Sequence, residues 1–316
     1  YPRLDEVPAT DRETEFFWML EELNPELILI DTLQATDFIV LYRFLAERSI
    51  RIATINSMLP TQVFENHPPL NSDVIPSKGP TDSQEIRAMK NNQLKKRWIS
   101  KLLQLGFDDQ FLIERRLKKN SVSSRNVSKI PNLLNFAVAD ITEFILAPRE
   151  FDFPYFRPAT NQLYVGFLTD QSRYEPSTGE YEKVAPQIFT AGKACGMKLV
   201  YCSFGTVASR KKKIVLTLLR HLIELSTKVN YNLIISLKAQ EELETSLAKT
   251  KGVYIFNSVP QLQVLKHADL FVTHGGLNSI KEAVYAEVPM LLFPLHPEYD
   301  PKGNAARAEY YGLGRR

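Results

Sequence analysis

The loop that follows the apolar run Leu270–Val272 holds the residues best suited to chemistry in this chain. A His-Gly-Gly turn at 274–276 separates this predicted strand from a helix-compatible segment that opens near Asn278. Glycines at such a turn let backbone N–H groups approach a ligand closely, and a helix N-terminus favours an anion. His274 can donate to a phosphate oxygen, and Glu282, one turn into the helix, can accept from two neighbouring sugar hydroxyls. The spacing predicts a nucleoside diphosphate site without a P-loop or a Gly-x-Gly-x-x-Gly motif.

The elements that must position this loop follow from the pattern of apolar runs. In the second half of the chain, short apolar runs alternate with helix-compatible segments, which is typical of a parallel α/β sheet. Strands are predicted at Leu199–Phe204, Leu233–Leu237, Val253–Phe256, Leu270–Thr273 and Met290–Phe293. The helices predicted between them span 211–228, 240–247, 260–266 and 279–286. Ligands bind at the carboxyl ends of such strands, where the His-Gly-Gly turn stands.

The first half of the chain shows the same alternation, interrupted by a long insertion. Strands are predicted at Leu27–Ile30, Ile52–Ile55 and Phe144–Ala147, with a helix over Phe38–Ala46. Residues 65–140 form the insertion, which opens with a Pro- and Ser-rich run and continues through predicted helices. A linker rich in Ser, Tyr, Pro and Gly is predicted at Gln171–Glu182. We therefore expect two domains with a boundary near residue 170.

A longer signature surrounds the His-Gly-Gly turn. In order along the chain, its parts are Pro260-Gln261, the run from His274 to Ser279, Glu282, Val288-Pro289-Met290, Pro294, Asp300, Asn304 and Gly312-Leu313-Gly314. This order resembles the donor-binding signature of the UDP-glycosyltransferase superfamily, whose members are inverting enzymes of GT-B fold. A lone His274 would more often be an ordinary loop histidine, but so many positions in register favour the ligand-binding interpretation.

The resemblance implies an α/β protein of GT-B fold, in which two Rossmann-like doubly wound domains face each other across a cleft. Residues 1–170 correspond to the acceptor-binding domain, and residues 171–316 to the domain that binds the nucleotide-sugar donor. The sequence opens at Tyr1 in the middle of the family pattern. We therefore expect the N-terminal domain to be incomplete here, without its first βα units.

The same resemblance assigns the donor contacts to the second domain. The residues that it implies are Ser203, Gly205, Thr206, Val259, Gln261, His274, Gly275, Gly276, Asn278, Ser279, Glu282 and Asp300. The turn at 203–206 resembles the family's Ser-Phe-Gly-Ser, which lines the diphosphate opposite the His-Gly-Gly turn. An ordinary strand-to-helix turn with Thr206 as its cap is the alternative.

Two departures from the family pattern leave the nucleobase contact and the sugar open. The tryptophan that stacks on uracil in plant members is absent at 258–259, so backbone groups are expected to hold the base. The Gln that usually contacts sugar hydroxyls is replaced by Pro301, and the gap between Pro294 and Asp300 is longer than usual. By its spacing from Pro294, Glu298 is an alternative for the carboxylate position.

Sugar transfer with inversion needs a base that takes the proton of the acceptor hydroxyl. The family uses a His near the N-terminus, which an Asp at the end of a later strand orients. Asp31 follows the run Leu27–Ile30 and matches that Asp, so it is assigned as catalytic; a helix cap before Thr32 is the alternative. All five histidines follow Asp31, so the catalytic base is expected upstream of this sequence.

The insertion contains a basic and apolar segment at 87–119. Lys and Arg outnumber Asp and Glu in it, and Trp98 and Leu102 interleave with Lys95 and Lys101. The family resemblance places the acceptor pocket in this region. A basic amphipathic helix here could rest on an anionic membrane as a peripheral contact. A solvated face over core leucines is the alternative, and it is the usual meaning of a charge run.

The composition is that of an ordinary globular protein that is large enough for two cores. The chain has 316 residues, of which 44% are hydrophobic and 24% charged. Its net charge of +3 is too small to indicate a nucleic-acid partner. No apolar run reaches the ~18 residues that span a bilayer, and no signal peptide is recognisable. The sparse pair of Cys195 and Cys202 indicates reduced thiols, with Cys202 in the core, and a cytoplasmic protein.

Together, the residues and the resemblance predict an enzyme, a metal-independent inverting hexosyltransferase of the bacterial small-molecule or macrolide type. Its donor is a UDP- or dTDP-sugar, its acceptor is a hydroxyl of a lipophilic small molecule, and no further cofactor is expected. Three alternatives of the same fold stay open. They are a sugar-nucleotide-binding homologue without a base, a lipid or cell-wall glycosyltransferase, and a nucleotide-sugar epimerase.

Overall fold

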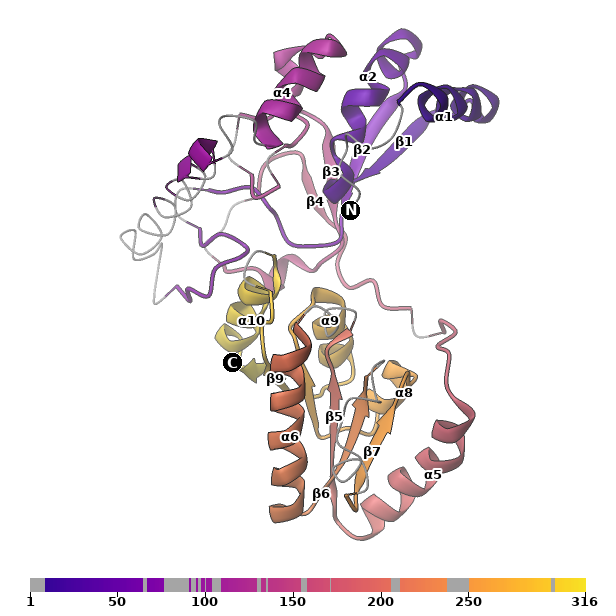
Figure 1. The fold of residues 1–316 in the computed structure, drawn as a ribbon, viewed down its shortest axis with the longest axis vertical. Coiled ribbons are helices and arrows are strands. Elements are labelled where there is room, and N and C mark those ends of the chain that lie inside the picture. Colours follow the sequence, from indigo (N-terminus) through magenta and orange to yellow (C-terminus); the bar gives the residue numbers. More distant parts are fainter. Residues whose placement is uncertain are drawn as a thin grey trace. The chain divides into compact units, whose positions relative to one another are not determined.

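The fold is that of a computed structural model. It describes residues 9–64, 67–76, 91, 95, 98–99, 101–103, 109–129, 132–134, 136–154, 158–170, 172–205, 211–237, 250–296 and 299–316. The chain divides into two compact units (Figure 1). The first comprises Tyr1–Pro69 and Pro76–Gly166, and the second comprises Leu70–Ile75 and Phe167–Arg316. Each unit is built around a parallel sheet of its own.

Four parallel strands form the sheet of the first unit, in the order β1-β2-β3-β4. They are β1 Leu27–Asp31, β2 Arg51–Asn56, β3 Thr142–Ile145 and β4 Gln162–Tyr164. The helices described in this unit are α1 Ala9–Leu23, α2 Asp37–Arg48 and α4 Asp109–Lys119. Short 3-10 turns occur at η1 Thr32–Gln34, η2 Ser124–Asn126 and η3 Arg149–Phe151.

Helix α2 shows how the sequence builds this unit. Phe38, Leu41 and Leu45 recur at helical spacing, and all three belong to the buried cluster that includes Ile30 of β1. An apolar stripe of this kind drives a helix onto the sheet. The helix ends at Ser49, whose φ of 55° is left-handed and turns the chain into β2.

Six parallel strands form the sheet of the second unit, in the order β10-β9-β8-β5-β6-β7. They are β5 Lys198–Ser203, β6 Tyr231–Ser236, β7 Val253–Phe256, β8 Leu270–Thr273, β9 Met290–Leu292 and β10 Gly314–Arg315. The chain enters this sheet at β5, adds β6 and β7 on one side, and then adds β8, β9 and β10 on the other. The direction of winding therefore reverses between β5 and β8. In doubly wound sheets, this point opens a ligand crevice outside the carboxyl ends of the strands.

The helices described in the second unit cover this sheet (Figure 1). They are α5 Gly179–Ala194, α6 Lys212–Lys228, α8 Gln261–Leu265, α9 Leu277–Tyr285 and α10 Pro301–Tyr310. Val215 and Leu219 of α6 share a buried cluster with Cys202 of β5 and Ile235 of β6. Cys202 thus lies in the core as predicted, Cys195 is exposed, and both thiols are free.

The segment after the first sheet differs from its prediction. The linker predicted at Gln171–Glu182 ends early, because α5 begins at Gly179 and continues through Pro186. Gly and Pro are poor helix formers, so their presence concealed this helix in the sequence. The helix predicted at 240–247 lies outside the described residues.

The short segment Leu70–Ile75 belongs to the second unit, although the sequence suggested the first. Arg316 donates from Nη1 to the carbonyl oxygen of Asp73 at 2.7 Å. On α10, Gly303 packs so closely against this segment that a Cβ there would overlap the carbonyl oxygen of Leu70. The pattern of apolar residues along the sequence does not predict backbone contacts of this kind.

Part of the insertion exposes apolar side chains. Trp98, Leu102 and Leu103 leave 73%, 78% and 77% of their surface accessible. The interpretation of these leucines as core residues is therefore wrong. Lys95 and Lys101 are also exposed beside them. Across the described ranges, no helix combines the length and the apolar character that crossing a membrane requires.

Candidate functional site

Three loops of the second unit leave the sheet at one level. Ser203 ends β5 and pairs with Thr273 of β8, and Thr273 pairs with Leu292 of β9. The loops that follow these strands therefore start side by side at the carboxyl edge of the sheet. The structure thus brings together the predicted site residues of the turn at 203–205 and of the His-Gly-Gly turn. Thr206 lies outside the described residues.

Close packing of glycine fixes the His-Gly-Gly turn. Gly275 has a φ of +86°, and a Cβ on it would lie 3.1 Å from the carbonyl oxygen of Pro301. A Cβ on Gly276 would lie 2.7 Å from Nε2 of His274, so only glycine leaves room for this ring position. A Cβ on Gly205 would lie 3.4 Å from Cε1 of the same ring. The turns after β5 and β8 therefore meet at His274.

His274 is held in the neutral state. Burial, together with the charge of His296, lowers the pKa of His274 to about 4. At pH 7 the ring therefore carries one N–H donor and one acceptor nitrogen. Its Nδ1 atom is buried and has no hydrogen-bond partner among the described residues, and the same holds for Thr273 Oγ1 and Asn304 Oδ1. Because buried polar atoms are ordinarily hydrogen-bonded, this cluster at the end of β8 is suited to a polar ligand.

Helix α9 points its N-terminus at the same turn. Gly276 is its N-cap residue and supplies no side chain to bond the first backbone N–H groups. Asn278 is exposed and Ser279 is half-buried in the first turn. The uncapped N–H groups and the helix dipole together favour an anion at this position. Phosphate oxygens are among the anionic groups that such a helix start binds.

Glu282 lies in the second turn of α9 and is buried. Its Oε2 accepts a hydrogen bond from Nε2 of Gln261 at 2.6 Å, and Oε1 forms an ion pair with Nη1 of Arg173 at 2.7 Å. Gln261 begins α8 and accepts from the hydroxyl of Tyr201 at 3.1 Å. The predicted residues Gln261 and Glu282 are therefore in contact. Val259, two residues before Gln261, is buried.

Arg173 is a residue of the site that the sequence did not indicate. It lies in the predicted linker, 109 residues before Glu282, and no part of the signature includes it. A lone arginine in a polar segment gives no periodic or spacing signal. The ion pair became visible only when the fold placed the two residues together.

The start of α10 is tied to the His-Gly-Gly turn. Asn304 donates from Nδ2 to Oδ2 of Asp300 at 2.7 Å and to the carbonyl oxygen of Gly275 at 3.1 Å. Burial raises the pKa of Asp300 above its usual range. Pro301 occupies the first position of the helix, where its missing N–H costs nothing. Asp300 thus stands at the same edge as His274, while the alternative Glu298 lies outside the described residues.

Asp31 is the assigned residue of the first unit. It ends β1, is exposed, and accepts a hydrogen bond from the backbone N–H of Leu33 at 2.8 Å as the N-cap of η1. Asp31 thus shows both features that the sequence suggested, the position at the strand end and the cap.

The first unit also pairs the buried His67 with Asp152 at 3.0 Å. These residues are 85 positions apart, and no motif or spacing in the sequence connects them.

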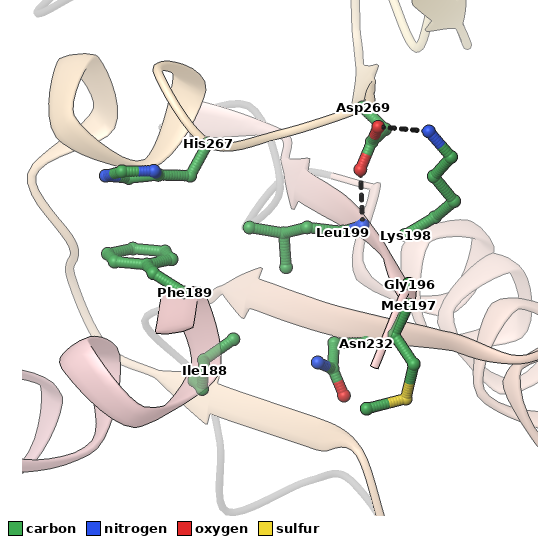
Figure 2. Close-up of a pocket in the computed structure, with 9 residues that line it drawn as sticks. All are labelled: Ile188, Phe189, Gly196, Met197, Lys198, Leu199, Asn232, His267 and Asp269. Carbon is green, nitrogen blue, oxygen red and sulfur yellow. Dashed lines mark hydrogen bonds and ion pairs between the residues drawn. The ribbon is translucent and has the colours of Figure 1, made fainter. Parts of the chain in front are cut away.

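The cavity drawn in Figure 2 is a separate feature of the second unit. It measures about 220 Å³ and lies at the amino ends of β5, β6 and β8, the edge opposite the His-Gly-Gly turn. Asp269 accepts hydrogen bonds there from Nζ of Lys198 and from the backbone N–H of Leu199, both at 2.8 Å. The ring of His267 stacks on Phe189 with centroids 4.1 Å apart. Because none of the predicted donor residues lines this cavity, it is distinct from the candidate site.

Comparison with known proteins assigns the class. The model of the UDP-glucoronosyl and UDP-glucosyl transferase family matches residues 97–314, more than half of the chain. The chain therefore belongs to the UDP-glycosyltransferase family, as its donor signature predicted.

Curated relatives match over parts of their length. The Caenorhabditis elegans protein ugt-50, which is named among the UDP-glucuronosyltransferases, is 28% identical over 63% of this chain and 36% of its own length. NDP-glycosyltransferase YjiC of Bacillus licheniformis is 48% identical over 61 residues, which are 19% of this chain and 15% of that protein. The zeaxanthin glucosyltransferase of Pantoea ananas is 34% identical over 22% of this chain and 16% of its own. The chain thus spans about a third or less of these relatives.

Solved structures share the fold. The glycosyltransferase of kitacinnamycin superposes with a TM-score of 0.65 at 18% identity, over 98% of this chain and 67% of that one. A UDP-glucose:anthocyanidin 3-O-glucosyltransferase in complex with UDP gives a TM-score of 0.58 at 15% identity, over 96% and 66%. These likenesses confirm the prediction of a GT-B fold with parallel α/β sheets.

Proposed function

We propose that this chain is the donor-binding part, with a portion of the acceptor-binding part, of an inverting glycosyltransferase. The enzyme transfers a hexose from a UDP- or dTDP-sugar to a hydroxyl of a lipophilic small molecule. The observation that carries the proposal is the convergence of three groups at one sheet edge. These are neutral His274, the uncapped start of α9 and the carboxylate of Glu282.

Each group has a task in the proposed reaction. The acceptor oxygen forms a bond to C1 of the sugar while the bond from C1 to the diphosphate oxygen breaks, and the acceptor proton goes to a base. Negative charge grows on the leaving diphosphate, where donors placed in advance stabilise the transition state most. The N–H of His274 and the first N–H groups of α9 are such donors, and Glu282 accepts from the ribose hydroxyls. No metal ion is required in this arrangement.

The printed names of relatives support this choice of ligands. The structural neighbours include a glucosyltransferase in complex with UDP and a spinosyn rhamnosyltransferase complexed with thymidine diphosphate. A zeaxanthin glucosyltransferase is among the sequence relatives. For this chain we therefore propose a donor that contains a pyrimidine nucleoside diphosphate and an acceptor that is an apolar alcohol or phenol. In this proposal Asp31 orients the base, and Asp300 contacts the transferred sugar.

A lipid acceptor is the second candidate. The observation that favours it is the exposure of Trp98, Leu102 and Leu103 beside Lys95 and Lys101. Apolar side chains flanked by cations suit the surface of an anionic membrane. In that case the enzyme takes its acceptor from the membrane, and the donor site is unchanged.

Isothermal titration calorimetry of the chain with UDP and dTDP in excess EDTA tests the proposed function. Binding in EDTA that is lost or weakened in His274→Ala supports the donor site. Binding that needs magnesium, or no binding at all, would contradict it. Lys198→Met, which breaks an ion pair at the opposite edge of the same sheet, is the matched control and should bind UDP like the parent chain.

A further inference from the structure

We propose that Arg173 is a positioning residue for the ribose of the donor, because it holds the carboxylate of Glu282 in the orientation that accepts from the two ribose hydroxyls. This inference rests on the proposed function, since it takes a nucleoside diphosphate as the ligand. It adds the segment before α5 to the site.

The burial of the two partners is unequal. The side chain of Glu282 leaves 6% of its surface accessible, whereas that of Arg173 leaves 39%. A buried carboxylate is costly unless a cation and hydrogen-bond donors compensate its charge. The cation of Arg173, 2.7 Å from Oε1, supplies this compensation and fixes the direction in which the carboxylate points.

The remaining acceptor capacity of Glu282 matches a ribose. In the described part of the chain, its Oε1 accepts from Arg173, and its Oε2 accepts from Gln261. An ionised carboxylate offers about four lone-pair positions, two on each oxygen. One position on each oxygen is therefore left for a ligand. Two neighbouring hydroxyls, such as the 2′ and 3′ hydroxyls of ribose, fit this pair, and a 2′-deoxyribose can use only one.

Arg173 is itself held in place. Its Nη2 and Nε donate to Oε1 of Glu175 at 2.6 and 3.3 Å, and Oε2 of Glu175 accepts from the backbone N–H of Leu262 at 2.8 Å. The hydrogen bonds to Glu282 and Glu175 raise the pKa of Arg173 further, so it is charged at every accessible pH. A planar guanidinium can bond both carboxylates in fixed directions, which the point charge of a lysine cannot.

The test compares UDP with 2′-deoxy-UDP on the 316-residue chain by calorimetry. The parent should bind UDP about tenfold more tightly than 2′-deoxy-UDP, because one hydrogen bond to a charged acceptor is lost. In Arg173→Met this ratio should fall toward one, with UDP weakened about tenfold and 2′-deoxy-UDP weakened less. Arg173→Lys should give an intermediate ratio. A purely structural role would weaken both nucleotides alike and keep the ratio.

Controls separate this inference from the proposed function. Failure of the parent chain to bind UDP would contradict the proposed donor site itself. UDP binding by the parent with an unchanged ratio in Arg173→Met would overturn the role of Arg173 alone. Lys198→Met, which breaks a different ion pair of the same unit, should leave both affinities and their ratio as in the parent. If Arg173→Met lacks a cooperative melting transition, Arg173→Lys decides, and the parental ratio in that variant overturns the inference.

Discussion

Gly276→Ala is the substitution whose effect follows most directly from the geometry. The added Cβ would lie 2.7 Å from Nε2 and 3.2 Å from Cε1 of His274. The backbone of Gly276 has a φ of −63° and a ψ of 137°, which alanine adopts without strain. The clash is therefore with a movable ring, and the expected response is rotation of His274 away from the turn.

The magnitude follows from what the rotated ring no longer does. A hydrogen bond to a charged group contributes about 1.5–3 kcal/mol, so UDP affinity should fall roughly 10- to 100-fold. Stability should change by no more than about 1 kcal/mol, because a poorer N-cap residue is offset by lower chain entropy in the unfolded state. The double variant with His274→Ala should bind UDP no more weakly than His274→Ala by itself, because both changes remove the same contact.

Calorimetry with UDP and thermal melts of the same samples measure these two effects. Gly179→Ala is the matched control, since a Cβ on Gly179 meets no atom within 4 Å and its φ is not left-handed. If Gly276→Ala binds UDP like the parent, His274 does not contact the diphosphate. If the losses of UDP affinity in Gly276→Ala and His274→Ala add fully in the double variant, the two residues act separately. That result would refute the reasoning from the clash.

Three further predictions concern the titration of His274, the role of Asp31 and the basic segment of the insertion. Burial lowers the pKa of His274 to about 4. As the pH falls below about 6.5, this histidine therefore takes up a proton in the unfolded state while it is still neutral in the folded state. Urea melts should therefore show the free energy of unfolding falling between pH 6.5 and 4 more steeply in the parent than in His274→Gln; equal slopes would contradict this. Asp31→Asn should keep the cap and the melting temperature but lower the turnover of the enzyme, whereas Asp31→Ala should also cost about 1 kcal/mol of stability; full turnover in Asp31→Asn would leave only the capping role. The parent should bind anionic vesicles in low salt, and Lys95→Gln with Lys101→Gln should weaken this by ~1 kcal/mol per charge; absence of vesicle binding favours a soluble acceptor.

The second sheet was largely predictable from its apolar runs. Val253–Phe256 and Leu270–Thr273 are strands with the predicted bounds, since each is a short apolar run that ends at a turn. The start of α9 at Leu277 is close to its predicted position, because two glycines end the strand segment before it. The parallel order followed from the alternation of strands and helices. Local signals of this kind carry no information about distant partners.

What could not be predicted depends on tertiary contacts. The ion pair of Arg173 with Glu282 and the pair of His67 with Asp152 join residues that are 109 and 85 positions apart. No hydrophobic period or motif spacing connects such residues. The exposure of Leu102 and Leu103 has the same cause, because a leucine in a helical pattern indicates a face without showing what covers it.

A structure of this chain with UDP tests the central claim most directly. The account predicts the diphosphate against the first turn of α9, within hydrogen-bond distance of His274, and the ribose hydroxyls on Glu282. It also predicts that the cavity at Asn232 and Asp269 stays free of the nucleotide. UDP in that cavity, or a diphosphate that contacts neither His274 nor the N-terminus of α9, would contradict the assignment of the donor site.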